Sequence, residues 1–309
     1  YDPALDAWAG LKIPVYFLNP RRTHFDLGLG VGQTVGPDGH LGLSVGILPE
    51  YFNKNYLADG VDASGNGNIS TDERIYEDGV YREFDLQLEY RHRLVDRTTQ
   101  QPFGLEGALA AGYRMRTYSA PFDGRDESAP SVRAGLDASY AFRSGAAKGS
   151  GWVLKGGVFY KYEAVDAPTE PEVVLLDETF FGVDFSGDAD TTDTNARSVQ
   201  SGDRTRTEQR FGVSLGASIG PDLDLGVEYS RLLKDFDSGN PLDVSHSGRN
   251  DTRDDFGMSL KYGFSKGWDV KLGYEWRRQF TDRPDDPGSL GETTDYKRNI
   301  YYLSFLYRF

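Results

Sequence analysis

The sequence contains no cysteine, only two methionines and only four histidines. The absence of cysteine excludes disulfide bonds, thiolate metal sites and cysteine nucleophiles. No apolar run reaches the length of about 18 residues that a transmembrane helix needs. Basic residues are also the minority, because 34 Lys and Arg stand against 48 Asp and Glu, which gives a formal net charge of −14. Binding to nucleic acid requires a basic face, so a nucleic-acid partner is excluded.

Apolar residues instead alternate with polar or small residues along most of the chain. The last nine residues place an apolar side chain at every odd position, and residues 25–31, 84–90 and 211–219 show the same rhythm. A period of two is typical of β-strands with one apolar face. The alternation predicts twelve antiparallel strands, at residues 6–18, 24–36, 40–52, 80–94, 103–117, 130–142, 151–163, 205–219, 222–236, 252–264, 267–281 and 296–309.

The connections between these strands alternate in length. Tight turns are expected around residues 36–39, 220–222 and 265–267, and long polar loops over residues 49–79, 117–130, 163–204, 237–251 and 281–295. Short turns at one end and long loops at the other are typical of an outer-membrane β-barrel. Because no backbone donor can stay open in lipid, the last strand must pair with the first. The pattern predicts one closed transmembrane β-barrel domain over residues 1–309, with both termini on the side of the short turns.

A soluble β-sandwich or a lipocalin-like barrel is the alternative, with the apolar rows turned inward. Two features favour the membrane barrel. The polar face carries charges on many strands, as a water-containing lumen would. The apolar face ends in aromatic residues such as Tyr113, Trp152 and Trp268, and aromatic rings with polar tips belong at membrane interfaces.

The last strand carries a resemblance to a known class. It ends in Phe309, with Tyr307, Phe305, Leu303 and Tyr301 at alternate positions, and it resembles the C-terminal signature of Gram-negative outer-membrane β-barrel proteins. The resemblance implies a place in the bacterial outer membrane with periplasmic termini, contact with membrane lipid and lipopolysaccharide, and recognition by the barrel-assembly machinery during biogenesis. The acidic outer loops add a surface or envelope protein as a candidate partner.

Charged residues at inward positions are the predicted lumen lining. They are Asp85, Glu89, Arg91, Glu106, Arg114, Arg116, Arg133, Glu228, Lys271, Glu275, Arg277 and Arg298. In one interpretation the acidic and basic groups stand apart around a water-filled pore. In the other they form salt bridges that close the barrel, because charges buried without water must pair. The glycine-rich inner faces of strands 24–36 and 40–52 leave volume for water, for an inward fold of the acidic segment 163–204, or for a partner.

The segment 62–73 resembles an EF-hand calcium loop. Its candidate ligands are Asp62, Ser64, Asn66, Asn68, Ser70 and Glu73, with Gly67 at the sharp turn. Ca²⁺ takes six to eight oxygen ligands, and a glutamate at the twelfth position supplies two of them. Because only Asp62 and Glu73 bring charge, the sequence predicts a weak, structural Ca²⁺ site with an affinity on the order of 10⁻⁴–10⁻³ M. The alternative is a polar, glycine-rich loop that matches by chance.

The leading functional hypothesis is a porin-like outer-membrane channel for the diffusion of small polar solutes, with selectivity set by the lumen charges. The second is a closed, anchoring barrel whose acidic outer loops bind a surface partner. The third is an outer-membrane hydrolase. None of the four histidines stands with a serine or aspartate in a recognisable motif, so no catalytic residue is assigned and an enzyme is not expected.

Overall fold

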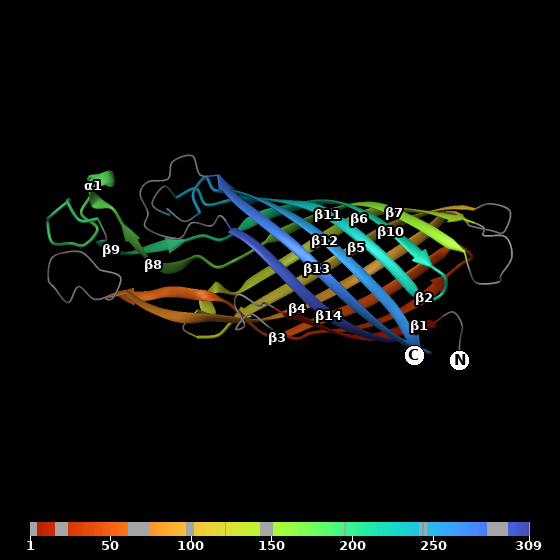
Figure 1. Cartoon of the computed structure of the whole chain (residues 1–309). Coiled ribbons are helices and arrows are strands. Elements are labelled where there is room, and N and C mark those ends of the chain that lie inside the picture. The colour runs from red at the N-terminus through yellow and green to blue at the C-terminus, as the bar shows by residue number, and fades with distance from the viewer. Residues whose placement is uncertain are drawn as a thin grey trace.

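The chain forms a closed antiparallel β-barrel with a small two-stranded extension at one end (Figure 1). The structure is a computed structural model that describes residues 5–15, 24–60, 74–96, 102–120, 122–142, 151–194, 196–240, 243, 246–282 and 296–308. The predicted fold class and the predicted number of strands are confirmed. The twelve barrel strands are β1 (Leu5–Val15), β2 (Asp26–Val35), β3 (Gly39–Gly60), β4 (Arg74–Val95), β5 (Phe103–Tyr118), β6 (Glu127–Phe142), β7 (Trp152–Val165), β10 (Arg206–Ile219), β11 (Leu223–Phe236), β12 (Asn250–Ser265), β13 (Trp268–Asp282) and β14 (Tyr296–Arg308).

The first and last strands close the barrel. β1 pairs with β14, with Trp8 opposite Arg308 and Val15 opposite Tyr301. Each of the other neighbours in the ring is also a neighbour in sequence, except that β7 pairs with β10. The start of β1 and the end of β14 therefore lie at the barrel end that carries the tight turns at residues 36–38, 220–222 and 266–267. In this closed ring every strand has a hydrogen-bonded neighbour on both sides. Strands in lipid need such partners for their backbone N–H and C=O groups.

Large apolar side chains cover the outside of the barrel. Leu215 is 71% exposed and Leu109 is 64% exposed, whereas charged residues such as Glu163 and Arg206 are buried on the inside. Each large apolar side chain left in water forgoes about 1.5–3 kcal/mol of burial free energy. An apolar wall of this extent is therefore suited to hydrocarbon and not to water. The soluble alternative, which needs these rows packed in a dry centre, is excluded.

Aromatic side chains stand at both ends of this apolar wall. Near the tight turns Trp268 packs against Tyr307, with 4.7 Å between ring centroids, and further along the strands Tyr160 packs against Phe211 at 4.9 Å. Trp152 and Tyr160 are eight residues apart on β7, which is about 26 Å of strand. A strand tilt of about 40° reduces this span to roughly 20 Å, close to the apolar band of about 25 Å in outer-membrane barrels.

Two of the predicted long loops are shorter than the sequence indicates. A loop is predicted over residues 49–79, but β3 continues to Gly60 and β4 begins at Arg74, and the two remain paired. A loop is predicted over 117–130, but β5 runs to Tyr118 and β6 begins at Glu127, with the 3-10 turn η2 (Asp123–Arg125) between them. Beyond the apolar wall apolar and polar residues no longer alternate strictly along the strand, although the backbone pairing continues.

The acidic segment between β7 and β10 does not enter the lumen, which corrects one of the occupants predicted for the interior. β8 (Glu170–Leu176) and β9 (Ala196–Gly202) pair in a separate two-stranded sheet, and α1 (Glu178–Phe181) follows β8. Figure 1 shows this extension projecting away from the barrel at the end opposite the C-terminus. Leu176 and Ala196 are opposite each other and fully buried. Among the described residues, no helix is long and apolar enough to cross a membrane.

Candidate functional site: the charged interior of the barrel

The inward side chains at the long-loop end of the barrel form a dense ionic group, called here the mouth cluster. Its members are Glu83, Arg114, Arg116, Glu127, Lys161, Glu163, Arg206, Glu208 and Lys234. Arg116 donates to Glu83 at 2.7 Å and to Glu127 at 3.1 Å. Arg206 donates to the other oxygen of Glu127 at 3.1 Å and to Glu208 at 2.8 Å. A cavity of about 240 Å³ lies among these side chains.

Strand pleating explains why the mouth cluster assembles. Arg114 and Arg116 are two residues apart on β5, and Arg206, Glu208 and Arg210 alternate on β10, so each set faces the same side of the sheet. The neighbouring strands present glutamates at the same height. Glu127 and Glu163 are buried, at 9% and 5% exposure, and buried carboxylates require charged partners.

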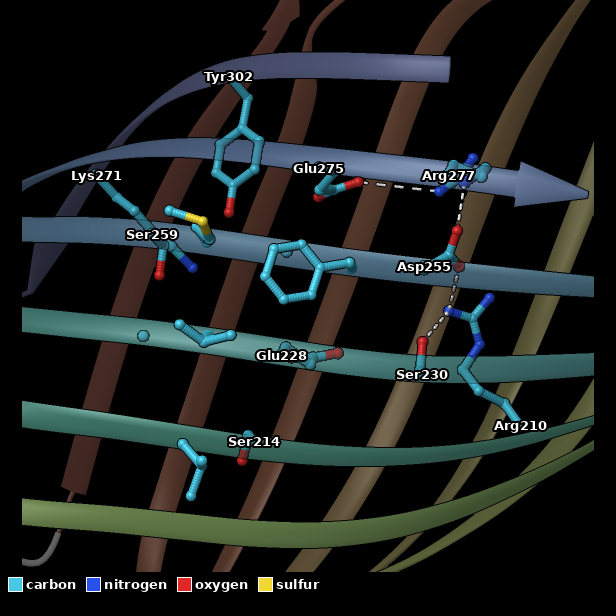
Figure 2. A pocket seen from close by; sticks show the side chains of 16 residues that line it. Arg210, Ser214, Glu228, Ser230, Asp255, Ser259, Lys271, Glu275, Arg277 and Tyr302 are labelled. Atoms are coloured by element: carbon cyan, nitrogen blue, oxygen red, sulfur yellow. Dashed lines mark hydrogen bonds and ion pairs between the residues drawn. The ribbon is translucent and has the colours of Figure 1, made fainter. Parts of the chain in front are cut away.

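A second group, the central cluster, surrounds Asp255 on β12 (Figure 2). Three arginines surround Asp255: Arg277 donates to it at 2.7 Å, Arg253 at 3.1 Å and Arg210 at 3.2 Å. Arg277 also lies 3.9 Å from Glu275. Figure 2 shows Arg210, Asp255, Glu275 and Arg277, with Glu228, Lys271 and Tyr302, around one cavity of about 240 Å³. Arg253 lies outside the lining of this cavity.

Of the four cavities described here, the largest lies near the tight turns. A cavity of about 730 Å³ is lined there by residues that include Arg91, Glu106, Asp137 and Lys155. Arg91 lies 2.5 Å from Glu89 and 3.3 Å from Glu106. A smaller cavity of about 70 Å³ adjoins it and is lined by residues that include Arg133 and Glu228. The interior is thus divided into polar compartments of unequal size.

The ion pairs inside the barrel run along its wall. Among pairs between described residues, each joins one strand to itself, to its neighbour or to the next strand but one. The longest reach across one intervening strand, as Arg206 does from β10 to Glu127 on β6, and Lys155 from β7 to Asp224 on β11. No pair of described residues connects opposite walls. Of the two predicted arrangements, the geometry favours charged groups around a polar lumen over salt bridges that cross it.

Part of the volume above the inner glycines is filled by aromatic rings. Three inward aromatic residues each lie directly opposite a glycine on the adjacent strand, and a Cβ atom at that glycine would fall inside the ring. The pairs are Trp8 with Gly30, Phe159 with Gly212, and Tyr302 with Gly273. Cations lie over two of these rings: Arg133 lies 4.5 Å from the Phe159 centroid and Lys12 lies 4.4 Å from that of Tyr302. The rings therefore lie against the glycines of the barrel wall.

The structure places the predicted lumen residues as follows. Arg114 and Arg116 belong to the mouth cluster, and Glu228, Lys271, Glu275 and Arg277 to the central cavity. Glu89, Arg91, Glu106 and Arg133 line the compartments toward the turns. Asp85 lies between Gly46 and Arg114 in register, and Arg298 lies over the ring of Tyr296.

Several interior residues were missed by reasoning from the sequence. Glu127 falls inside the predicted loop 117–130, and Glu163 falls at the predicted end of a strand. Arg206, Glu208 and Arg210 alternate on a predicted strand, so their inward direction was readable from the sequence. The arginine group around Asp255 depends on contacts across β10, β12 and β13, which the sequence does not reveal.

A serine, an aspartate and a histidine meet in the connection between β11 and β12. Asp243 accepts a hydrogen bond from Ser238 at 2.8 Å and lies 3.0 Å from Nδ1 of His246. Burial acts to raise the pKa of Asp243, but the hydrogen bond and charge of His246 outweigh it and hold the pKa below its ordinary value. The serine hydroxyl points to the aspartate and not to the histidine, so this order lacks the base that a serine nucleophile needs. The three residues act as a structural clamp.

The predicted calcium ligands Asp62, Ser64, Asn66, Asn68, Ser70 and Glu73 lie outside the described residues. No known protein-family model matches the sequence, and no curated protein is similar to it.

Solved barrel structures are similar to the chain along its length. The NanC porin has 12% sequence identity and a TM-score of 0.41, with 99% of this chain and 100% of that chain covered. The beta domain of the Bordetella autotransporter BrkA has 11% identity and a TM-score of 0.41, with 98% and 99% covered. The Pseudomonas putida toluene transporter TodX has 8% identity and a TM-score of 0.42, with 100% and 90% covered.

Proposed function

We propose that the protein is a narrow outer-membrane channel through which small polar solutes diffuse, with a preference for anions. The channel needs no cofactor and performs no catalysis. The observation that carries the proposal is the direction of the interior ion pairs, which follow the wall and leave polar compartments between them. Charges that line water without spanning it are suited to conduction.

The preference for anions follows from the central cluster. The cavity of the central cluster is lined by three basic groups, Arg210, Lys271 and Arg277, and by three acidic groups, Glu228, Asp255 and Glu275. Arg253, which also donates to Asp255, and Lys12, which lies 3.6 Å from Glu275, adjoin this cavity and bring the group to five cations against three anions. The long reach of a charge in a low-dielectric wall makes such an excess effective on passing ions.

Single-channel recording tests this proposal. The refolded protein, inserted in a planar bilayer with a gradient of KCl, should give steady conductance steps and a reversal potential displaced toward that of chloride. Conductance without any displacement of the reversal potential would refute the proposed anion preference. A bilayer that shows no conductance although the barrel is correctly folded would refute the proposed channel.

The anchoring barrel is the second candidate, and one observation supports it. The β8–β9 sheet and the long β3–β4 hairpin project beyond the barrel ring (Figure 1), and residues 170–195 of the first carry eight Asp and Glu and no Lys or Arg. A protein partner on the surface or in the envelope would dock there. The silent bilayer is the result this candidate predicts. The hydrolase has no support among the described residues, since Ser238 donates to Asp243 and not to His246.

The position in the membrane is part of the proposal. Just beyond the outer aromatic residues, Arg231, Asp254, Arg278 and Lys297 are aligned side by side on β11 to β14 and face outward. Three cations against one acid at this height suit the phosphate groups of lipid or lipopolysaccharide. In this proposal the long connections lie at the cell surface and the termini in the periplasm, where the barrel-assembly machinery would meet the last strand.

A further inference from the structure

One carboxylate in the β8–β9 extension is fully buried, and only one of its two oxygen atoms accepts hydrogen bonds. Glu178, the first residue of α1, has no exposed surface. Its Oε1 accepts the backbone N–H groups of Phe185 and Ser186, the latter at 2.7 Å. Its Oε2 is buried and has no hydrogen-bond partner. A buried, unsatisfied polar atom costs about 1–3 kcal/mol, and more when it is charged, so a missing partner is indicated.

Two further carboxylates lie close to the carboxylate of Glu178. One oxygen each from Glu178, Asp184 and Asp188 lies within 4.8 Å of the other two. Two ligands that share one Ca²⁺ ion at 2.3–2.6 Å can stand at most about 4.6–5.2 Å apart. Three carboxylates at this distance repel each other unless a cation lies between them.

The neighbouring backbone orients one of these groups. The N–H groups of Gly187 and Ala189 donate to the two oxygens of Asp184 at 2.5 Å and 2.7 Å and fix the carboxylate in the turn. The protein offers no counter-charge nearby in sequence. Residues 170–195 contain eight Asp and Glu and no Lys, Arg or His.

We propose that Glu178, Asp184 and Asp188 bind one Ca²⁺ ion at the turn between β8 and β9. The ligands are hard oxygen atoms, and the ion would supply the partner that Oε2 of Glu178 lacks. Water and backbone carbonyl groups complete the six to eight ligands that Ca²⁺ takes. The ion would fix the turn at the tip of the extension, independently of whether the barrel conducts.

Calorimetric titration of the full-length barrel in detergent with CaCl₂ tests the site. The variants Glu178→Gln, Asp184→Asn and Asp188→Asn should each lose one equivalent of Ca²⁺ or weaken its binding roughly tenfold or more, because each removes a charged ligand. Asp190→Asn is the matched control. Asp190 lies in the same turn, is exposed and outside the group of three, and accepts the N–H of Thr192 at 3.0 Å, so its variant should bind as the wild type does.

Two additional arms keep the result unambiguous. Glu73→Gln removes the loop site predicted at residues 62–73, and the equivalent of Ca²⁺ assigned to the extension should survive in that variant. Asp188 is exposed, so Asp188→Asn tests the site without disturbing a buried residue. A difference in gel migration between unheated and heated protein confirms that each variant is a folded barrel. The proposal is overturned if Glu178→Gln and Asp188→Asn bind Ca²⁺ as the wild type does. It is also overturned if the wild type binds no Ca²⁺ even at concentrations well above about 10⁻³ M.

Discussion

Tyr302 lies flat over Gly273, the residue directly opposite it across the β13–β14 ladder. The ring occupies the space that a side chain on the glycine would fill, and the ammonium group of Lys12 lies 4.4 Å from the ring centroid. The ring therefore packs against the wall at Gly273 and is contacted by a cation. Because Gly273 has no Cβ atom, the Tyr302 ring can lie close to the wall at this height of the lumen.

Gly273→Ala should destabilise the barrel by about 1–3 kcal/mol, because the new methyl group displaces a ring with no room to retreat except into the lumen. Urea unfolding of the barrel in detergent, followed by tryptophan fluorescence, measures the change. Gly257→Ala is the control, since the nearest atoms to its Cβ lie at 3.9 Å. That variant should be neutral or slightly stabilising. Equal effects of the two variants would contradict the close packing, and Tyr302→Ala should relieve the strain of Gly273→Ala.

The sequence predicted the barrel well because one physical constraint repeats on every strand. Lipid on one side of a strand and water on the other impose a period of two on its side chains. Leu215 and Leu225, for example, occupy outward positions in such alternating stretches. The constraint ends where the lipid ends. Beyond it apolar and polar residues no longer alternate strictly, which is why the paired residues of β3 and β4 past Tyr51 were predicted as a loop and why Glu127 was missed.

The interior was only partly predictable for a different reason. Alternation reports that Arg277 faces inward, but it does not report which residues stand opposite on neighbouring strands. The pairing of Tyr302 with Gly273 and the convergence of three arginines on Asp255 depend on the register between strands. That register is set by closure of the whole ring, which a local pattern does not contain.

Arg277→Gln should shift the ion preference of the channel toward cations, because it removes a positive charge from the central cluster and leaves Asp255 with two arginines. The reversal potential in a KCl gradient should move toward that of potassium, and the conductance should change. Arg278→Gln is the matched control, since the next residue on β13 faces outward and lies 3.8 Å from the ring of Phe280. A shift of the same size in both variants would show that the central cluster does not set the preference.

Glu127→Ala should destabilise the barrel by about 3 kcal/mol, because it leaves Arg206 and Arg116 buried without their shared acid. The side chains of Glu127 and Arg206 are each only 7% exposed. Urea unfolding again measures the loss. The contrasting case is the outward pair of Arg231 and Asp254, in which the arginine is 52% exposed. Asp254→Ala should cost no more than about 1 kcal/mol, and an equal loss in the two variants would be incompatible with a buried mouth cluster.

Acidification should release the connection between β11 and β12. The pKa of Asp243 is held below its ordinary value despite burial, chiefly by the hydrogen bond and charge of His246, and its carboxylate also accepts from Ser238 and from the backbone of Asp203. Such a group contributes stability that is fully present above the unfolded pKa of about 3.9 and is lost as the pH falls through the lower folded pKa. Hydrogen exchange of residues 236–249 should therefore stay slow down to about pH 4 and accelerate below it.

Two variants identify the group responsible for this acid response. Asp243→Asn should already exchange faster at neutral pH and should lose most of the acceleration near pH 4, because its amide does not titrate. Asp237→Asn changes an exposed aspartate of the same connection and should keep the wild-type profile. His246→Gln should weaken protection at every pH while leaving a carboxyl to titrate, at a pH closer to that of a free aspartate. An unchanged acid profile in Asp243→Asn would show that the clamp around Asp243 does not hold the connection in place.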